Sequence, residues 1–577
     1  MNPLVAALCA FGIYALGFFV YARFLSRRIF RLDPERRTPA HVLRDEVDYV
    51  PTNRFVLFGH HYASITGLAP MLGPAVAVIW GWLPAMLWVV FGAVLVGCVH
   101  DFSALVVSMR ARGLSVGKVA EGVIGRRAKG LFLALIFFGV SLAMGVFVFV
   151  IAKLFEAGED YRPDDLAAAT TSFPSAVLPS GALMVLAMIM GYLLYRKKFP
   201  LAPTTAVGFV LMLAFVWLGT IFPTLGIDPT GWPTVTGWTL ILLGYAYLAS
   251  VLPVWSLLQA RDFLNSLLLY LGLASAYIGF FILGPTFKAP PVNPNPEGAP
   301  SLFPFVFIVI ACGAASGFHG LVSSGTTSKQ IARETDARFV AYGGMVGESL
   351  LGLLAVLACT AGFASKSSWE SAYVSWSSIS QGLGAKLGSF IQGTAGFIEV
   401  LGVPSELAVA FVAVVVVSFA LTTLDSGTRL LRFNISEIGS SLGIGFLGNR
   451  FVATALAAGA IGFFAFYDEA RLAIWELFGV TNQLLAGLTL TVVSLYLWQR
   501  GRSPWFTGIP AIFMLVSTLT AMVQKIWKFV GDRNYLLLTV IAFLFFIAIG
   551  ILVESFRAVR RRERHEGDLI ALPDDAA

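Results

Sequence analysis

Apolar runs of about 20 residues, each long enough to cross a bilayer as an α-helix, recur along the whole chain. Between them, loops rich in Lys and Arg alternate with acidic or Pro-rich loops. Because basic residues gather on the cytoplasmic side of a membrane, this alternation predicts an N-terminus on the outer side of the membrane, a cytoplasmic C-terminus and about 15 spans. The expected spans are residues 4–22, 55–81, 84–109, 131–153, 177–195, 204–223, 236–259, 264–286, 303–327, 339–362, 405–428, 451–466, 477–498, 505–524 and 535–556.

The second expected span carries helix breakers in its middle. Residues 59–81 read GHHYASITGLAPMLGPAVAVIWG, with Gly67, Pro70, Gly73 and Pro74 at the centre. Proline removes a backbone donor, and lipid cannot replace a lost hydrogen bond, so a break is tolerated only where protein or a water-filled cavity receives the freed groups. Many secondary transporters build their substrate sites at such breaks. We therefore expect a break at Gly67–Pro74 that forms one wall of a transport site.

A second interruption is expected at Pro253, within the span 236–259. Two broken helices, five spans apart and entering from opposite sides, predict an all-α polytopic fold with a LeuT-type five-plus-five inverted repeat. One extra helix would precede the repeat, and about four would follow it. The expected divisions are residues 1–50 (N-terminal span and basic loop), 51–230 (first repeat), 231–435 (second repeat, with an outer segment at 363–403) and 436–577 (C-terminal helices and basic tail).

The composition supports a membrane protein and excludes other classes. Of the 577 residues, 57% are hydrophobic and 13% are charged, whereas soluble domains carry about 25% charged residues. The net charge of +7 fits cytoplasmic loops and membrane lipid better than nucleic acid. The sequence contains no phosphate-binding loop, zinc motif or nucleophile elbow. We therefore expect no enzyme, no metal site and no cofactor, but a coupling ion, H⁺ or Na⁺.

Polar residues beside the two expected breaks mark a candidate substrate site. An ionisable residue inside a span is costly to bury and is a functional candidate for that reason. The alternatives are a packed histidine, a structural hydrogen bond or, for Trp and Gln near a helix end, an anchor at the membrane surface. The candidate substrate-binding residues are His60, His61, Ser64, Thr66, Gly67, Trp255, Gln259 and His319.

A second set of residues could couple transport to an ion gradient. Three carboxylates lie inside expected spans, and four hydroxyl residues lie near the cytoplasmic end of the span 303–327. The carboxylates could carry protons or brace helices, and the hydroxyls could hold a cation or simply bond back to their own helix. Which of His60, His61 and Asp101 carries a proton stays open. The candidate coupling residues are Asp101, Ser323, Ser324, Thr326, Thr327, Glu348 and Asp425.

Other polar residues favour a structural interpretation. Arg261 and Asp262 lie close to the expected membrane edge, where an ordinary interfacial ion pair is expected. Asn482 and Gln483 lie in the C-terminal spans, outside the expected repeat.

Several long motifs, in order between about residue 30 and about residue 530, resemble the carbon-starvation protein (CstA) family. The motifs are DYVPTNRFVLFGHHYASITGLAPMLGP, WGWLPAMLWVVFGAVLVGCVHDF, LPVWSLLQARDF, ACGAASGFHGLVSSGTTSKQ, LTTLDSGTR and WELFGVTNQLLAG. The resemblance implies an inner-membrane transporter of small peptides or pyruvate, made during nutrient limitation, with a LeuT-type fold. It also implies transport driven by an ion gradient, with protons implicated for the pyruvate importers. The outer segment 363–403 is shorter than in the longest members.

Two alternative functions fit an all-α membrane protein. A channel for small organic acids could also use broken helices, although it usually needs subunit symmetry or a continuous polar path. A nutrient-sensing receptor would need a partner such as a sensor kinase, since the sequence has no sizeable cytoplasmic domain.

Overall fold

The computed structural model describes residues 2–46, 48–157, 171–253, 257–376, 383–467 and 471–561. Within these ranges the chain is helical, with isolated bridges and no β-strand. The helices are α1 (Pro3–Leu16), α2 (Ala22–Phe24), α3 (Pro39–Val42), α4 (Arg54–Ile65), α5 (Ala69–Ala77), α6 (Trp82–Leu87), α7 (Cys98–Arg110), α8 (Val116–Val123), α9 (Arg126–Phe155), α10 (Val177–Gly191), α11 (Leu201–Ile221), α12 (Val235–Val251), α13 (Leu258–Leu283), α14 (Leu302–Ala314), α15 (Gly317–Gly325), α16 (Gly343–Ala361), α17 (Lys366–Ala372), α19 (Leu383–Glu399), α20 (Ser405–Leu442), α21 (Arg450–Ala465), α22 (Arg471–Gln499), α23 (Trp505–Gly531) and α24 (Tyr535–Arg561).

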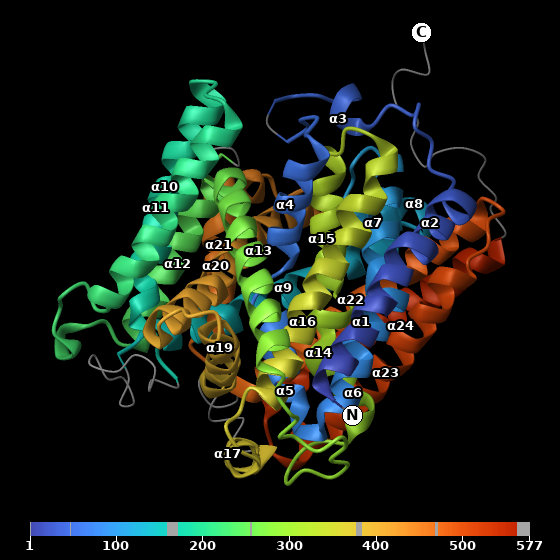
Figure 1. Ribbon diagram of the computed structural model, residues 1–577. Coiled ribbons are helices and arrows are strands. Elements are labelled where there is room, and N and C mark those ends of the chain that lie inside the picture. The colour runs from blue at the N-terminus through green and yellow to red at the C-terminus, as the bar shows by residue number, and fades with distance from the viewer. Residues whose placement is uncertain are drawn as a thin grey trace.

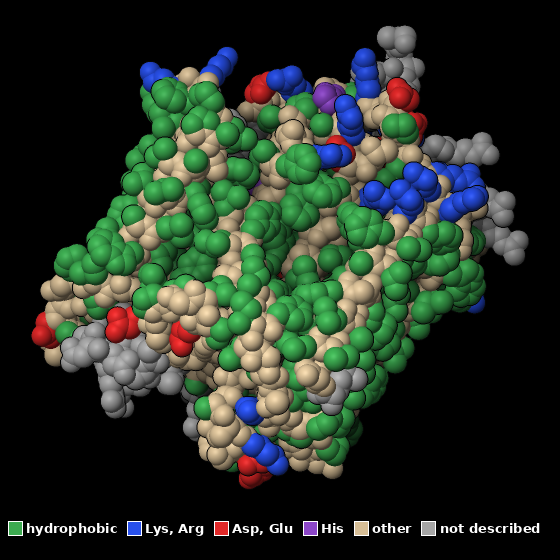
Figure 2. Space-filling model, in the orientation of Figure 1, with side chains coloured by type: hydrophobic (Ala, Val, Ile, Leu, Met, Phe, Trp, Pro, Cys, Tyr) green, Lys and Arg blue, Asp and Glu red, His purple; other side chains and the backbone are tan. Residues whose placement is uncertain are grey.

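The described residues form twelve helical stretches that are long and apolar enough to span a membrane. The pair Arg54–Ile65 and Ala69–Trp80 forms a further, bent span, and Val235–Val251 and Arg450–Ala465 are shorter apolar helices. The polytopic all-α fold is therefore confirmed, whereas the count of about 15 spans stays a prediction. Figure 2 shows the corresponding surface, with Lys and Arg side chains along the upper rim and a broad hydrophobic band below them.

The helices form two groups around the centre of the molecule. In one group, α5 packs on α14 and α16 contacts both, whereas α4 and α7 pack on α16 and α15 packs on α7 and α4. In the other, α9 packs along α20, and both contact α12 and α21. In Figure 1 the hairpin α10–α11 lies at one side of the molecule, whereas α1, α23 and α24 lie toward the other. A substrate path is therefore expected between the two groups.

Pro253 does not interrupt a span. The helix α12 ends at Val251, and α13 begins at Leu258, so Pro253 lies in the connection between two separate helices. Proline is common just after a helix end because it cannot continue the helix. The prediction of a break inside 236–259 was therefore wrong. The second interruption lies instead between α14 and α15, at residues 315–316.

This position suggests a different division of the repeat. One set would be α4–α5, α6–α7, α9, α12 and α13, and the other α14–α15, α16, α20, α21 and α22. The contacts agree, because α5 packs on α16 as α15 packs on α7, and α12 packs on α20 as α21 packs on α9. The hairpin α10–α11 would then be an insertion in the first set. The division at residue 231 stays a prediction, but this packing favours one between Gly284 and Ser301.

Candidate transport site

The first break separates α4 from α5 by the three residues 66–68, and the two halves are bent by 48°. Gly67 is required here, because a Cβ would lie 2.6 Å from the Oγ1 atom of Thr423 on α20. Pro70 occupies the first turn of α5, where the backbone donors have no partner within the helix. The interruption is thus shorter than the predicted break at Gly67–Pro74, because Pro70 and Pro74 both belong to α5.

The second break is made by two residues with extended backbone. Ala315 and Ser316 have φ values of −162° and −131°, and α15 begins at Gly317. The side chain of Asn482 on α22 holds this turn, since its Oδ1 accepts hydrogen bonds from the Phe318 N–H (2.9 Å) and the Ser316 hydroxyl (3.1 Å). Asn482 therefore supplies a cap that the chain does not provide locally. These contacts are structural, as predicted for Asn482. They hold the second break, however, whereas the sequence placed Asn482 outside the repeat.

A chain of four buried ionisable side chains adjoins the second break. His100 Nδ1 lies 2.8 Å from Asp101 Oδ1, and Asp101 Oδ2 lies 2.9 Å from His319 Nδ1. His319 Nε2 in turn lies 3.0 Å from Glu348 Oε2. All four residues are fully buried. The structure therefore brings together three residues that the sequence marked separately, on α7, α15 and α16.

The two neighbouring histidines of α4 point to different helices. His60 Nδ1 lies 2.8 Å from Asp262 Oδ2 on α13, an oxygen that also accepts a hydrogen bond from Ser64 at 3.3 Å. His61 Nδ1 lies 2.8 Å from the hydroxyl of Thr327, beyond α15. This divergence is expected for adjacent helical residues, which point about 100° apart. The two imidazoles thus connect the first broken helix to α13 and to the segment that follows α15.

A second charged network, which the sequence did not predict, joins α12, α13 and α20. Arg261 bonds to Asp425 on α20 and to the hydroxyl of Tyr245 on α12, and Tyr245 donates to Asp425 at 2.6 Å. Arg261 and Asp262 are 1% and 0% exposed. The two charged groups lie 3.9 Å apart, as a pair would, but they are buried inside the protein, so the exposed setting expected for this pair was wrong. A buried charge is retained only when it is paired, and here the pairing braces α12, α13 and α20.

The hydroxyl residues at the end of α15 do not converge on one point. The Ser324 hydroxyl accepts a hydrogen bond from the Val116 N–H at 3.3 Å, whereas Thr327 faces His61. Ser323 is fully buried, and its hydroxyl has no partner among the described residues. Thr326 lines a cavity. A cation site formed by these four residues therefore stays a prediction, as does a substrate role for Thr66, whose buried hydroxyl is also without a described partner.

Two candidate residues lie outside what the structure describes. Trp255 falls in the range 254–256, and the side chain of Gln259 is not described either. Their proposed contacts with substrate stay predictions.

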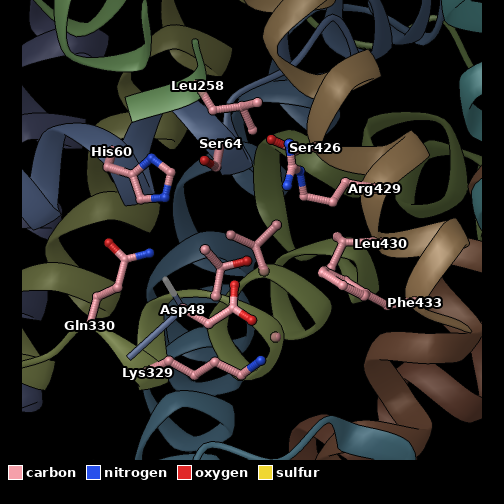
Figure 3. A pocket seen from close by; sticks show the side chains of 13 residues that line it. Asp48, His60, Ser64, Leu258, Lys329, Gln330, Ser426, Arg429, Leu430 and Phe433 are labelled. Carbon is pink, nitrogen blue, oxygen red and sulfur yellow. The ribbon is translucent and has the colours of Figure 1, made fainter. Parts of the chain in front are cut away.

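A small cavity with both polar and apolar lining residues lies between the two helix groups, beside the first break. Its volume of about 30 Å³ is enough for one or two waters. Figure 3 shows His60 and Arg429 extending toward the cavity from opposite sides, with Asp48 and Lys329 at its other end. The lining residues are Asp48, His60, Ser64, Leu258, Val322, Gly325, Thr326, Lys329, Gln330, Ser426, Arg429, Leu430 and Phe433.

Two solved structures have a broadly similar course of the chain. A mutant of the manganese transporter of Eremococcus coleocola has a TM-score of 0.41 at 14% identity, covering 90% of this chain and 99% of that one. MhsT in complex with L-phenylalanine has a TM-score of 0.40 at 13% identity, covering 88% of this chain and 99% of that one.

Sequence relatives are more informative. The peptide transporter CstA of Campylobacter jejuni is 32% identical, with 91% of this chain and 80% of the relative covered. The pyruvate/proton symporter BtsT of Escherichia coli is 30% identical, with 92% and 82% covered. The profile of the family described as "Carbon starvation protein CstA" matches residues 2–368 and 365–521. These matches cover most of the chain, and the protein belongs to the carbon-starvation protein family.

Proposed function

We propose that the protein is a proton-coupled secondary transporter that takes up a small carboxylate-bearing nutrient, either a short peptide or pyruvate, by alternating access. The relatives named above are a peptide transporter and a pyruvate/proton symporter, and the two broken helices supply the kind of site that such transporters use. We place it in the bacterial inner membrane with a periplasmic N-terminus, and we expect no enzymatic activity.

The buried chain of His100, Asp101, His319 and Glu348 carries the proposal. Imidazoles and carboxylates within a span are the groups from which proton relays are built. The chain joins α15, directly after the second break, to α7 and α16. Any change at this break would therefore alter the distances on which proton binding depends. The hydroxyl residues near α15 do not form an equally compact group, so protons are favoured over Na⁺.

Uptake into proteoliposomes tests the function. The purified protein is reconstituted, and labelled pyruvate and labelled dialanine are offered with an imposed proton gradient, a sodium gradient or neither. We expect one substrate to accumulate with the proton gradient only. Protein-free vesicles correct for pyruvic acid that crosses lipid unaided. Equal uptake with and without either gradient would contradict secondary active transport, and accumulation with sodium alone would move the coupling site to the hydroxyl residues.

A further inference from the structure

We propose that Arg429 on α20 binds the carboxylate of the substrate, in the cavity on the cytoplasmic side of the first break. This assignment rests on the proposed function, since it takes a carboxylate to be the feature that peptides and pyruvate share. Arg429 is not part of the chain of ionisable groups described above, nor of the Arg261–Asp425 network.

Arg429 combines burial with an unused donor. It is 8% exposed and lines the cavity. Its Nη2 atom donates to the carbonyl oxygens of Ala249 (2.9 Å) and Leu252 (2.6 Å), at the end of α12, which fixes the guanidinium in place. Its Nε atom is buried and has no hydrogen-bond partner among the described residues. An unpaired buried donor is costly, and a carboxylate that enters the cavity would supply the missing acceptor.

The opposite wall of the cavity offers groups for the rest of a small acid. The Nε2 atom of His60 is buried without a described partner, and Ser64 and Thr326 also line this wall. These residues belong to α4 and to the end of α15, whereas Arg429 belongs to α20 in the other helix group. A substrate held between them would contact both groups that alternating access must move relative to each other.

A second cavity provides room beyond the first one. It has a volume of about 290 Å³ and shares four lining residues with the first cavity. Lys329 extends over this boundary, with its Nζ 5.4 Å from the centre of the Tyr49 ring and 6.0 Å from that of Phe433. A carboxylate at Arg429 could therefore be the anchored end of a molecule whose remainder extends toward the second cavity. The shared residues are Gly325, Lys329, Leu430 and Phe433.

Arg432 is a matched control. It lies one turn further along α20, is also 8% exposed, and donates from Nη1 to the carbonyl oxygen of Ser250 at 2.7 Å. It thus has the same structural role as Arg429 at the end of α12, but it does not line the cavity. A change in binding that follows from Arg429→Gln and not from Arg432→Gln can be assigned to the cavity.

Direct binding tests the assignment independently of transport. The purified full chain is titrated calorimetrically with sodium pyruvate and with dialanine, and then with pyruvamide and dialanine amide, in which an uncharged amide replaces the carboxylate. We expect at least one acid to bind about tenfold to a hundredfold more tightly than its amide, since a hydrogen bond to a charged group has about this effect. Arg429→Gln should remove that preference, Arg429→Lys should restore part of it, and Arg432→Gln should change the affinity by less than about threefold.

The outcomes separate the two proposals. Equal affinity for acid and amide in the unmodified protein, or no binding of either acid, would overturn the assignment without any variant. An Arg429→Gln protein that keeps the acid preference would do the same. Binding that depends on Arg429, with no uptake of either acid into proteoliposomes, would support the site and contradict the proposed transport.

Discussion

Replacing Glu348 by Gln should uncouple transport from the proton gradient while leaving substrate exchange intact. The change keeps the size of a side chain that is fully buried and removes its charge. Glu348 Oε2 lies 3.0 Å from His319 Nε2, so Gln can still fill the space beside His319. It can no longer supply a negative charge or take up a proton.

The magnitude follows from that distance. Two unit charges 3.0 Å apart interact by about 5.5 kcal/mol at an effective dielectric constant of about 20. A pH difference of one unit supplies only 1.36 kcal/mol per proton. The lost interaction is therefore several times larger than the driving force, and the remaining contact between His319 and Asp101 cannot replace a proton-binding carboxylate at this end of the chain.

The assay compares accumulation with exchange. One symported proton supports about tenfold accumulation for each unit of pH difference, so the unmodified protein should approach this ratio when the membrane potential is clamped at zero. Glu348→Gln should lower the ratio to about one, after subtraction of protein-free vesicles. Exchange of external labelled substrate for internal unlabelled substrate, without any gradient, should change by less than about threefold.

Glu476→Gln is the matched control, because it makes the same chemical change at another buried glutamate. Glu476 is 2% exposed and pairs with Lys525 between α22 and α23, whereas the proposed proton chain lies on α7, α15 and α16. This variant should keep the tenfold accumulation ratio in its folded fraction. The reasoning would be refuted if Glu348→Gln accumulated substrate as well as Glu476→Gln did, or if it lost exchange and accumulation equally.

The other predictions concern stability in detergent, measured by thermal unfolding. Gly73→Ala should destabilise the protein by about 1–3 kcal/mol, because the new Cβ would lie 2.5 Å from the carbonyl oxygen of Val309 on α14; Gly244→Ala, with nothing within 4 Å, should show no such loss. Glu476→Gln should cost about 3–5 kcal/mol, since it leaves a buried lysine unpaired, and a matching apolar change at the lysine should recover part of this loss. Burial lowers the pKa of Lys386, on α19 outside the described spans, from 10.5 to about 8. Because the unfolded chain then binds this proton more tightly than the folded protein does, stability should rise as the pH increases from about 8 toward 10.5, and Lys386→Met should remove that rise.

The first break and the spans could be predicted because their signals are local. Apolar length identifies a span in the sequence itself, and Gly67 with Pro70 marks a place where a helix cannot continue smoothly. The same local reasoning failed at Pro253, because proline occurs both at breaks inside a span and just after a helix end, and the sequence around it does not distinguish the two. Only the surrounding helices decide which of the two applies.

The second break could not be predicted from its own residues. Ala315 and Ser316 carry no strong helix-breaking signal, and the extended turn is held by Asn482, which is 166 residues away from Ser316. The burial of Arg261 and Asp262 could not be predicted either, since it depends on Asp425 and Tyr245 from other helices. Sequence reasoning could identify the ionisable residues, but not which of them would meet.

The two charged networks suggest how substrate and proton could be linked. Arg261, Tyr245 and Asp425 tie α12, α13 and α20 to one another, whereas His60 and Ser64 reach the same region from α4 through Asp262. If α4 moves relative to α20, the contacts to Asp262 must change while the Arg261–Asp425 pair can persist. A carboxylate at Arg429 would bind beside that changing contact, and His319 of the proposed proton chain lies on the other broken helix, which packs against α4. Movement of the two broken helices together would then alter both sites in one step, which is what coupled transport requires.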